Sequence, residues 1–254
     1  MKKLSLAAAV AMLDLVIVMS PTSSLKAAEL KVLAGGSLTG PLTEIAPQFE
    51  RASGHKLVIH FDSTPNLIKL ATSGALFDLG VVPVDVFKDA AAKARFAVGP
   101  TIDIARAGYG VAVRFGAPKP DLNTSAAFKK SMLDAQSIAY IPASAAGSYV
   151  TGVFERLGIA EQMKAKTKPQ TATTQIPQAV ARGEAELGVF LINVLMAPGV
   201  ELAGPFPAEL QQELVFSAAI AADSKQADAA KAFIRFLATP AATAVIKAAG
   251  MNPG

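Results

Sequence analysis

The sequence predicts an α/β fold with a largely parallel sheet, and three observations support this. Short apolar runs bounded by Gly, Pro, Ser or Asn alternate with segments whose apolar residues recur every three or four positions. Of the 254 residues, 52% are hydrophobic and 17% are charged, which suits a globular chain with a large core. Strands that alternate with helices are typical of parallel strands joined by helical crossovers. The length allows one large domain or two smaller ones.

The expected elements follow in chain order. Strands are expected at residues 30–34, 56–61, 79–82, 109–113, 137–141, 187–192 and 215–221. Helices are expected at residues 41–52, through Ala71 to Gly74, at 84–96, after Ser148 with Tyr149 and Val153 on one face, at 176–183, at 227–238 and from Thr239-Pro240 to Gly250. Residues 116–120 are expected to form a linker and residues 198–207 a turn-rich surface crossing.

The first predicted turn carries a candidate anion site. Gly35-Gly36 allows a sharp turn after the first strand, and Ser37 stands where a helix N-cap belongs. The first N–H groups of a helix lack internal partners, so this turn directs free donors and a hydroxyl to one place. The segment Asp62-Ser63-Thr64-Pro65-Asn66 repeats the arrangement after the second strand. An ordinary capped turn has the same local pattern, so both interpretations stay open.

The composition excludes several classes of function. The net charge is +4, and without residues 1–28 the chain keeps 21 basic and 19 acidic residues. No Lys/Arg cluster interleaved with aromatic residues is present, so nucleic-acid binding is not expected. The absence of cysteine excludes disulfides, thiolate metal sites, a Cys nucleophile and a lipoprotein anchor. No cofactor is expected.

Residues 1–28 resemble a secretory signal peptide. Lys2-Lys3 forms a basic start, and Leu4 to Leu13 is an apolar run of suitable length. Asp14 interrupts the apolar stretch, and an uncleaved membrane anchor is the alternative. The uncharged run is much shorter than the roughly 20 residues that a membrane span needs. Export is therefore the expectation.

No catalytic or metal-binding group stands out. Structural roles are expected for His55 and His60, because no second pair of His, Cys or clustered carboxylates has ligand spacing. Asp78 and Asp85 flank a buried strand, where capping and turn roles are expected and a metal site or an acid/base pair is the alternative. Tyr140 and Tyr149 are expected in the core or on a cleft wall. A serine nucleophile would have only two histidines available as base, so an enzyme is not the expectation.

Several segments together are similar to a known family. They are Gly36-Ser-Leu-Thr39, Phe61-Asp-Ser-Thr-Pro-Asn66, Ala146-Gly-Ser-Tyr149, the segment 181–188 and the segment 232–240. In order and spacing, the chain resembles the periplasmic solute-binding proteins of ABC importers, most closely the molybdate-binding type. The resemblance implies a two-lobed type II fold with a mixed, mostly parallel sheet in each lobe and a ligand cleft between them. Carried over, the first lobe is 29–106 with 217–254, the second is 107–216, and the hinge lies near 107–110 and 216–218.

The resemblance also implies a ligand site, and in this family hydroxyls and backbone N–H groups hold a tetrahedral oxyanion. The positions that match are Ser37 with Leu38, Ser63, Thr64, Ala146, Gly147, Ile176 and Leu191. Leu191 stands where the family has a tyrosine, and Asp62 would bring a negative charge near the anion if it points inward. These departures leave molybdate, sulfate, phosphate and a small carboxylate open as ligands.

The implied protein is a periplasmic monomer that delivers a small anion to a permease in the inner membrane. An enzyme on the same fold and an effector-sensing pair of lobes are the alternatives, although no helix-turn-helix segment precedes Leu30.

Overall fold

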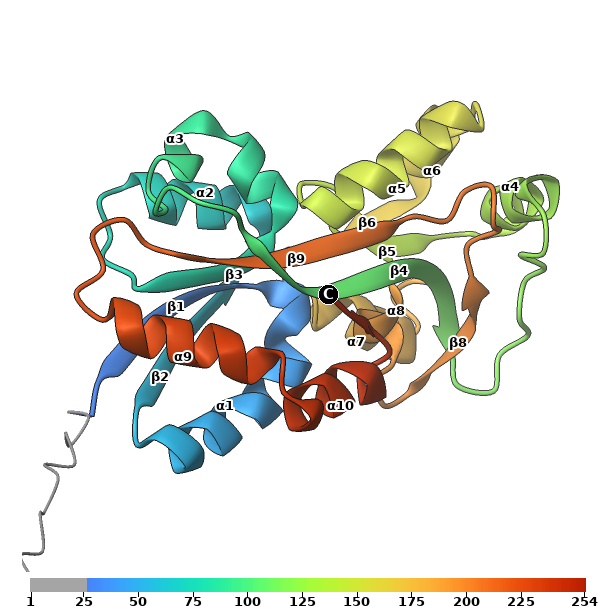
Figure 1. Ribbon diagram of the computed structural model, residues 1–254. Helices are drawn as coiled ribbons and strands as arrows, with labels where there is room; N and C mark the ends of the chain where they lie inside the picture. Colours follow the sequence, from blue (N-terminus) through green and yellow to red (C-terminus); the bar gives the residue numbers. More distant parts are fainter. Residues whose placement is uncertain (1–26) are drawn as a thin grey trace, which may run out of the picture.

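A mixed sheet runs through the computed structural model, which describes residues 27–254 (Figure 1). Its strand order is β2-β1-β3-β9-β4-β7-β5-β6, and β8 and β10 also pair with β4. The strands are β1 Glu29–Gly35, β2 Lys56–Asp62, β3 Leu79–Pro83, β4 Ile102–Arg114, β5 Ile138–Tyr140, β6 Thr167–Pro169, β7 Leu187–Leu191, β8 Val200–Pro205, β9 Glu213–Ile220 and β10 Asn252–Pro253. With helices packed around it, this sheet confirms the predicted α/β class.

The α-helices pack around the sheet and connect its strands. They are α1 Thr39–Ser53, α2 Thr64–Thr72, α3 Ala90–Lys93, α4 Ser125–Asp134, α5 Ala145–Arg156, α6 Ala160–Lys166, α7 Gln175–Ala181, α8 Ile192–Leu195, α9 Ala227–Leu237 and α10 Pro240–Ala248. Two 3₁₀ helices, η1 Gly36–Leu38 and η2 Val84–Lys88, follow β1 and β3.

The molecule has two lobes joined by β4. In the first lobe, β1 pairs in parallel with β2 and β3, and β9 runs antiparallel beside β3. In the second lobe, β5 pairs in parallel with β6 and β7, and β7 runs antiparallel to β4. Along β4, the pairing with β9 ends at Gly108 and the pairing with β7 begins at Tyr109. The exact lobe boundaries given above stay a prediction.

The first helix shows how the sequence produces this packing. Leu42, Ile45 and Phe49 lie on one face of α1 and are buried, as their three- and four-residue spacing predicts. Phe49 packs against Phe233 of α9 with ring centroids 4.9 Å apart, so the C-terminal part of the chain completes the core of the first lobe. The helix ends where Gly54 adopts a left-handed φ of 74° and donates its N–H to the Glu50 carbonyl.

The prediction of one helix over residues 84–96 is wrong. The segment forms η2 and the four-residue α3 instead. Asp89 separates them in an extended conformation, and its carboxylate accepts the Ala92 N–H at 2.8 Å. A short polar side chain that bonds the backbone locally competes with a continuous helix, and Asp89 restarts the helix here.

The prediction of a turn-rich crossing at residues 198–207 is also wrong. Val200–Pro205 forms β8, which pairs antiparallel with β4. Pro205 ends this strand, a position where the missing N–H is tolerated. The partner strand β4 is itself longer than the predicted 109–113, because it begins at Ile102 and pairs with β9 before it reaches the second lobe.

Within residues 27–254, no single helix is long and apolar enough to cross a membrane. The consecutive helices α9 and α10 pass the test of length and composition only as a pair, and they are bent by 60° at their junction. Residues 1–26 of the predicted signal peptide lie outside the described residues.

Candidate functional site

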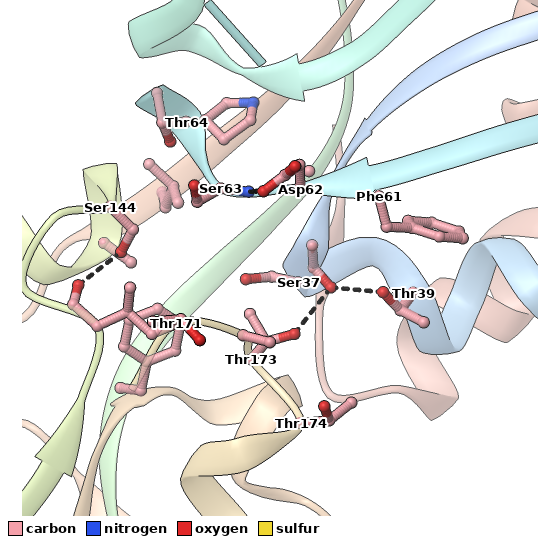
Figure 2. Close-up of a pocket in the computed structure, with 18 of the residues that line it drawn as sticks. Ser37, Thr39, Phe61, Asp62, Ser63, Thr64, Ser144, Thr171, Thr173 and Thr174 are labelled. Carbon is pink, nitrogen blue, oxygen red and sulfur yellow. Dashed lines mark hydrogen bonds between the residues drawn. The ribbon is translucent and has the colours of Figure 1, made fainter. Parts of the chain in front are cut away.

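A cavity of about 160 Å³ lies between the two lobes, where β1, β2 and β3 end. The first lobe contributes the turn at Gly36-Ser37 and the start of α2, and the second lobe contributes the start of α5 and the segment 171–174. Figure 2 shows these segments facing one another across the cavity. The space is large enough for several waters or one small ligand.

Hydroxyl groups from both lobes line the cavity. They belong to Ser37, Ser63, Thr64, Ser144, Thr171 and Thr173, with Thr39 and Thr174 at the edge toward the larger cavity described below. No Lys, Arg or His of residues 27–254 belongs to the lining. An anion in this space would therefore be held by hydroxyl and backbone dipoles and not by a salt bridge.

An apolar wall completes the lining of the cavity. Ile141, Phe190, Leu214 and Phe216 form most of this wall, and the last two come from β9. All four are buried core residues that expose only a face to the cavity. A ligand with a carbon skeleton can contact this wall while its oxygen atoms meet the hydroxyls.

Ser37 lines the cavity but does not cap a helix. It lies in η1, and Leu38 occupies the N-cap position of α1 without a side-chain capping bond. The predicted capping role is therefore wrong, because the chain makes a 3₁₀ turn before α1 begins at Thr39. Within the described residues, the Ser37 hydroxyl makes no hydrogen bond to protein, so it is available to a ligand.

Ser63 and Thr64 line the cavity at the start of α2. Ser63 is the N-cap residue of α2, but its hydroxyl makes no capping bond. Thr64 is buried, and its Oγ1 accepts the Ala145 N–H of the second lobe at 3.3 Å. In this structure, the Thr64 oxygen occupies a helix N-terminal donor that an anion would otherwise use.

The N-terminus of α5 brings Ala146 to the cavity but keeps Gly147 away from it. The Ser144 hydroxyl caps α5 by accepting the Gly147 N–H at 3.0 Å, and it donates to the Ile141 carbonyl at 2.9 Å. Gly147 is required by close approach, because a Cβ there would lie 1.6 Å from the Ile141 carbonyl oxygen. Its N–H is already paired in this structure.

Asp62 is the only side chain with an ionisable group on the cavity lining within the described residues. Its Oδ1 accepts the Ser63 N–H at 2.7 Å and the Asn66 amide at 2.8 Å. Partial burial raises the pKa of Asp62, but these hydrogen bonds outweigh burial and hold the pKa below its usual range. Asp62 is therefore ionised at neutral pH, at the edge of a space that otherwise suits an anion.

Four of the predicted site residues do not line the cavity. Leu38, Gly147, Ile176 and Leu191 are buried in the surrounding core. Two residues beyond Leu191, Asn193 donates from Nδ2 to the Ser37 carbonyl at 2.6 Å. The binding roles of these four residues stay a prediction, and Ser37, Ser63, Thr64 and Ala146 are the predicted residues that the fold brings together.

The remaining candidates do not line the cavity. His55 is buried and its Nδ1 accepts the Ala28 N–H at 3.1 Å, and Asp78 accepts the Lys31 N–H at 2.9 Å. Tyr149 donates to the Leu210 carbonyl at 2.7 Å, and neither it nor the buried Tyr140 lines the cavity. Residues 27–254 hold no group of three or more His, Asp or Glu side chains arranged for a metal ion.

The two lobes, the strand that crosses between them and the hydroxyl-lined cavity define a solute-binding protein. The chain belongs to the family of bacterial extracellular solute-binding proteins, whose model matches residues 30–252. It is 33% identical over 232 residues to an aconitate isomerase from a Pseudomonas species, covering 88% of this chain and 87% of that protein. It is 30% identical over 231 residues to the molybdate-binding protein of Azotobacter vinelandii, covering 89% of this chain and 90% of that protein.

The solved structures show the same fold. The periplasmic molybdate-binding protein of Azotobacter vinelandii superposes with a TM-score of 0.73 at 23% identity, covering 87% of this chain and 98% of that one. The predicted resemblance to the molybdate-binding type of solute-binding protein is thereby confirmed.

Proposed function

We propose that this protein is the periplasmic substrate-binding component of an ABC importer and that it captures a small anion between its lobes. The observation that carries the proposal is the cavity lined by hydroxyls from both lobes, with no Lys, Arg or His of residues 27–254 on its wall. Fixed dipoles around a small ion replace the hydrogen bonds of water, and they need no reorganisation when the ion arrives. The basic and apolar start of the chain supports export to the periplasm, and the permease in the inner membrane is the implied partner.

Two classes of anion fit this proposal. A tetrahedral oxyanion such as molybdate needs only the hydroxyls and N–H groups, and relatives with this ligand support it. The carbon skeleton of a small carboxylate can also pack against the apolar wall of Phe190, Leu214 and Phe216, whereas a bare oxyanion has no apolar atoms to do so. The ionised Asp62 repels multiply charged anions of both classes, so it does not separate them. The apolar wall is the feature that favours the carboxylate over the oxyanion.

A thermal-shift panel followed by calorimetry tests the proposal. The panel contains molybdate, tungstate, sulfate, phosphate, citrate and cis-aconitate, each added to the purified protein at neutral pH. A ligand at 100 times its Kd stabilises the folded state by about 2.7 kcal/mol, which raises the melting temperature by several degrees. We expect one-to-one binding of at least one carboxylate. If molybdate alone binds, the oxyanion is the preferred ligand class and the preference for a carboxylate is wrong. If no member of the panel binds, the result counts against the proposal.

Isomerisation of aconitate is the second candidate function, and the relative named above supports it. Moving a double bond in such a substrate requires a base that removes a proton and an acid that returns one. Asp62 is the one titratable side chain on the lining within the described residues, and its lowered pKa makes it a weak base near pH 7. The site therefore supports binding better than catalysis.

Proton NMR separates the two functions. Incubation of cis-aconitate with the protein in D₂O would, under the second candidate, give trans-aconitate with deuterium at the exchanged carbon, and Asp62→Asn would abolish the change. We expect the spectrum to stay that of cis-aconitate. Turnover that depends on Asp62 would establish an enzyme.

A further inference from the structure

Two side chains of the second lobe bind consecutive backbone carbonyls of the first lobe. The Thr173 hydroxyl donates to the Gly36 carbonyl at 3.1 Å, and the Asn193 amide donates from Nδ2 to the Ser37 carbonyl at 2.6 Å. The partners are 137 and 156 residues apart in the chain, so these bonds join the lobes and not neighbouring turns. Figure 2 shows the Thr173 bond beside the one that Thr39 makes to the same carbonyl. We call the Thr173 and Asn193 side chains, with their two bonds, the clasp.

The clasp lies between two cavities. On one side is the cavity of about 160 Å³, and on the other is a larger cavity of about 680 Å³ between α1, α7, α8 and α10. Gly36, Ser37 and Thr173 line both cavities, and Asn193 lines the larger one. The two bonds therefore lie at the boundary that the two cavities share.

We propose that the clasp is the gate of the small cavity, so that the ligand enters and leaves through the larger cavity when Thr173 and Asn193 release the Gly36-Ser37 turn. This inference rests on the proposed function for the identity of the small cavity as the ligand site. It adds which residues control exchange and which side of the molecule the ligand uses. The turn held by the clasp is also the one that presents the Ser37 hydroxyl, so release of the clasp and release of the ligand occur at the same place.

Pulsed electron-electron resonance on the ligand-free protein tests the gate without knowledge of the ligand. The chain has no cysteine, so Lys69→Cys on α2 and Glu155→Cys on α5 place one spin label on an exposed position of each lobe. The clasp is removed by Thr173→Val with Asn193→Leu, which keep the size of both side chains. Gln178→Leu is the control, because Gln178 lines the larger cavity but makes no side-chain hydrogen bond within the described residues.

We expect the clasp variant to increase the ratio of open to closed molecules at least tenfold, seen as a longer interlobe distance, and Gln178→Leu to keep the wild-type distribution. Circular dichroism checks the fold of each variant, and Thr173→Val alone, which is close to isosteric, serves if the double variant does not fold. Identical distance distributions for wild type and a folded clasp variant would overturn the gate and leave the proposed function standing. If wild-type protein binds no anion of the panel, the proposed function is overturned, whatever the distance distributions show.

Discussion

The hydroxyls around the cavity divide into those already paired and those free for a ligand. Thr64, Thr173 and Ser144 bond to backbone groups, and two of these bonds cross between the lobes. The Ser37 and Ser63 hydroxyls make no hydrogen bond to the described part of the protein. Because these two hydroxyls have no protein partner to give up when a ligand displaces water, the two serines are the donors that should contribute most to affinity.

Replacement of Ser37 by alanine separates binding from stability. Ser37 caps no helix, so Ser37→Ala should change the free energy of unfolding of the ligand-free protein by less than about 0.5 kcal/mol. Loss of a donor to a charged ligand should weaken binding by about 1.5–3 kcal/mol, or roughly 10- to 150-fold in Kd. Calorimetry with the ligand found in the panel measures the second effect, and urea unfolding measures the first. A large loss of ligand-free stability would restore the capping role.

The charge of Asp62 should weaken the binding of an anion in the cavity, while its hydrogen bonds stabilise the fold. Because the pKa of Asp62 is lowered in the folded protein, its stabilising effect is present above the unfolded value near 3.8 and is lost as pH falls through the folded value. Asp62→Asn should therefore be less stable than wild type at pH 7, and the difference should shrink in acid below pH 3.8. Melting curves at pH 7 and pH 3 check this; a difference independent of pH would contradict it.

The same substitution should strengthen the binding of a dianion. Removing a like charge at a partly exposed site should lower the Kd of molybdate or sulfate on the order of tenfold at low salt. Asn66→Ala provides the control, since it removes a hydrogen-bond partner of Asp62 and keeps the charge. Weaker dianion binding in Asp62→Asn would mean that this carboxylate positions the ligand.

Among the residues of the candidate site, those of the first lobe are easier to predict from the sequence than those of the second lobe. Ser37, Ser63 and Thr64 follow the ends of parallel strands, and that pattern is visible in the sequence. Thr173 and Asn193 reach the site only because the second lobe folds back onto the Gly36-Ser37 turn. No local pattern marks them, since the contacts depend on how the lobes meet. The run Thr171 to Thr174, with its three threonines, was the one available signal.

Among the elements, β4 joins the two lobes, and its edge pairs with two different strands. β8 pairs with Gly110 and the residues beyond it, and β9 pairs with the residues up to Gly108. Between these strands the chain leaves the sheet, and the side chain of Gln211 fills the gap opposite Tyr109. Its Oε1 accepts the Tyr109 N–H and its Nε2 donates to the Tyr109 carbonyl, both at 2.9 Å. The amide thus makes the two bonds that a strand residue would make.

Loss of this side chain should weaken the crossing between the lobes. Gln211→Ala leaves the Tyr109 N–H without its partner, which should lower the free energy of unfolding by about 1–3 kcal/mol. Gln212→Ala is the matched control, because its exposed side chain makes no hydrogen bond within the described residues. Urea unfolding of the two variants measures the difference. Equal stabilities would show that solvent replaces the Gln211 amide without cost.

The sequence predicts elements with strong periodicity and misses those defined by their partners. The helix with Leu42, Ile45 and Phe49 is evident because its apolar spacing sets its buried face. The strand β8 is not evident, since it is short, lies between Gly199 and Pro205 and exists through its pairing with β4. The break at Asp89 similarly depends on a local side-chain bond that a periodic pattern does not report.

For the whole molecule, the fold brings segments of the two lobes together into one candidate site. The Gly36-Ser37 turn and the start of α2 belong to the first lobe, and the start of α5 and the segment 171–174 belong to the second. Each lobe alone would leave its hydroxyls in water, where they gain little from an anion. Closure of the lobes removes water and makes the same dipoles more effective in a less polar space.

Native mass spectrometry of the protein released from the periplasm tests this account most directly, because it identifies the bound molecule and its stoichiometry together. Wild type should carry one small anion per chain, and the double variant Ser37→Ala with Ser63→Ala should lose most of it while keeping its fold. A bound species that the double variant retains at wild-type occupancy would contradict the account, because the ligand would then lie outside the hydroxyl-lined cavity between the lobes.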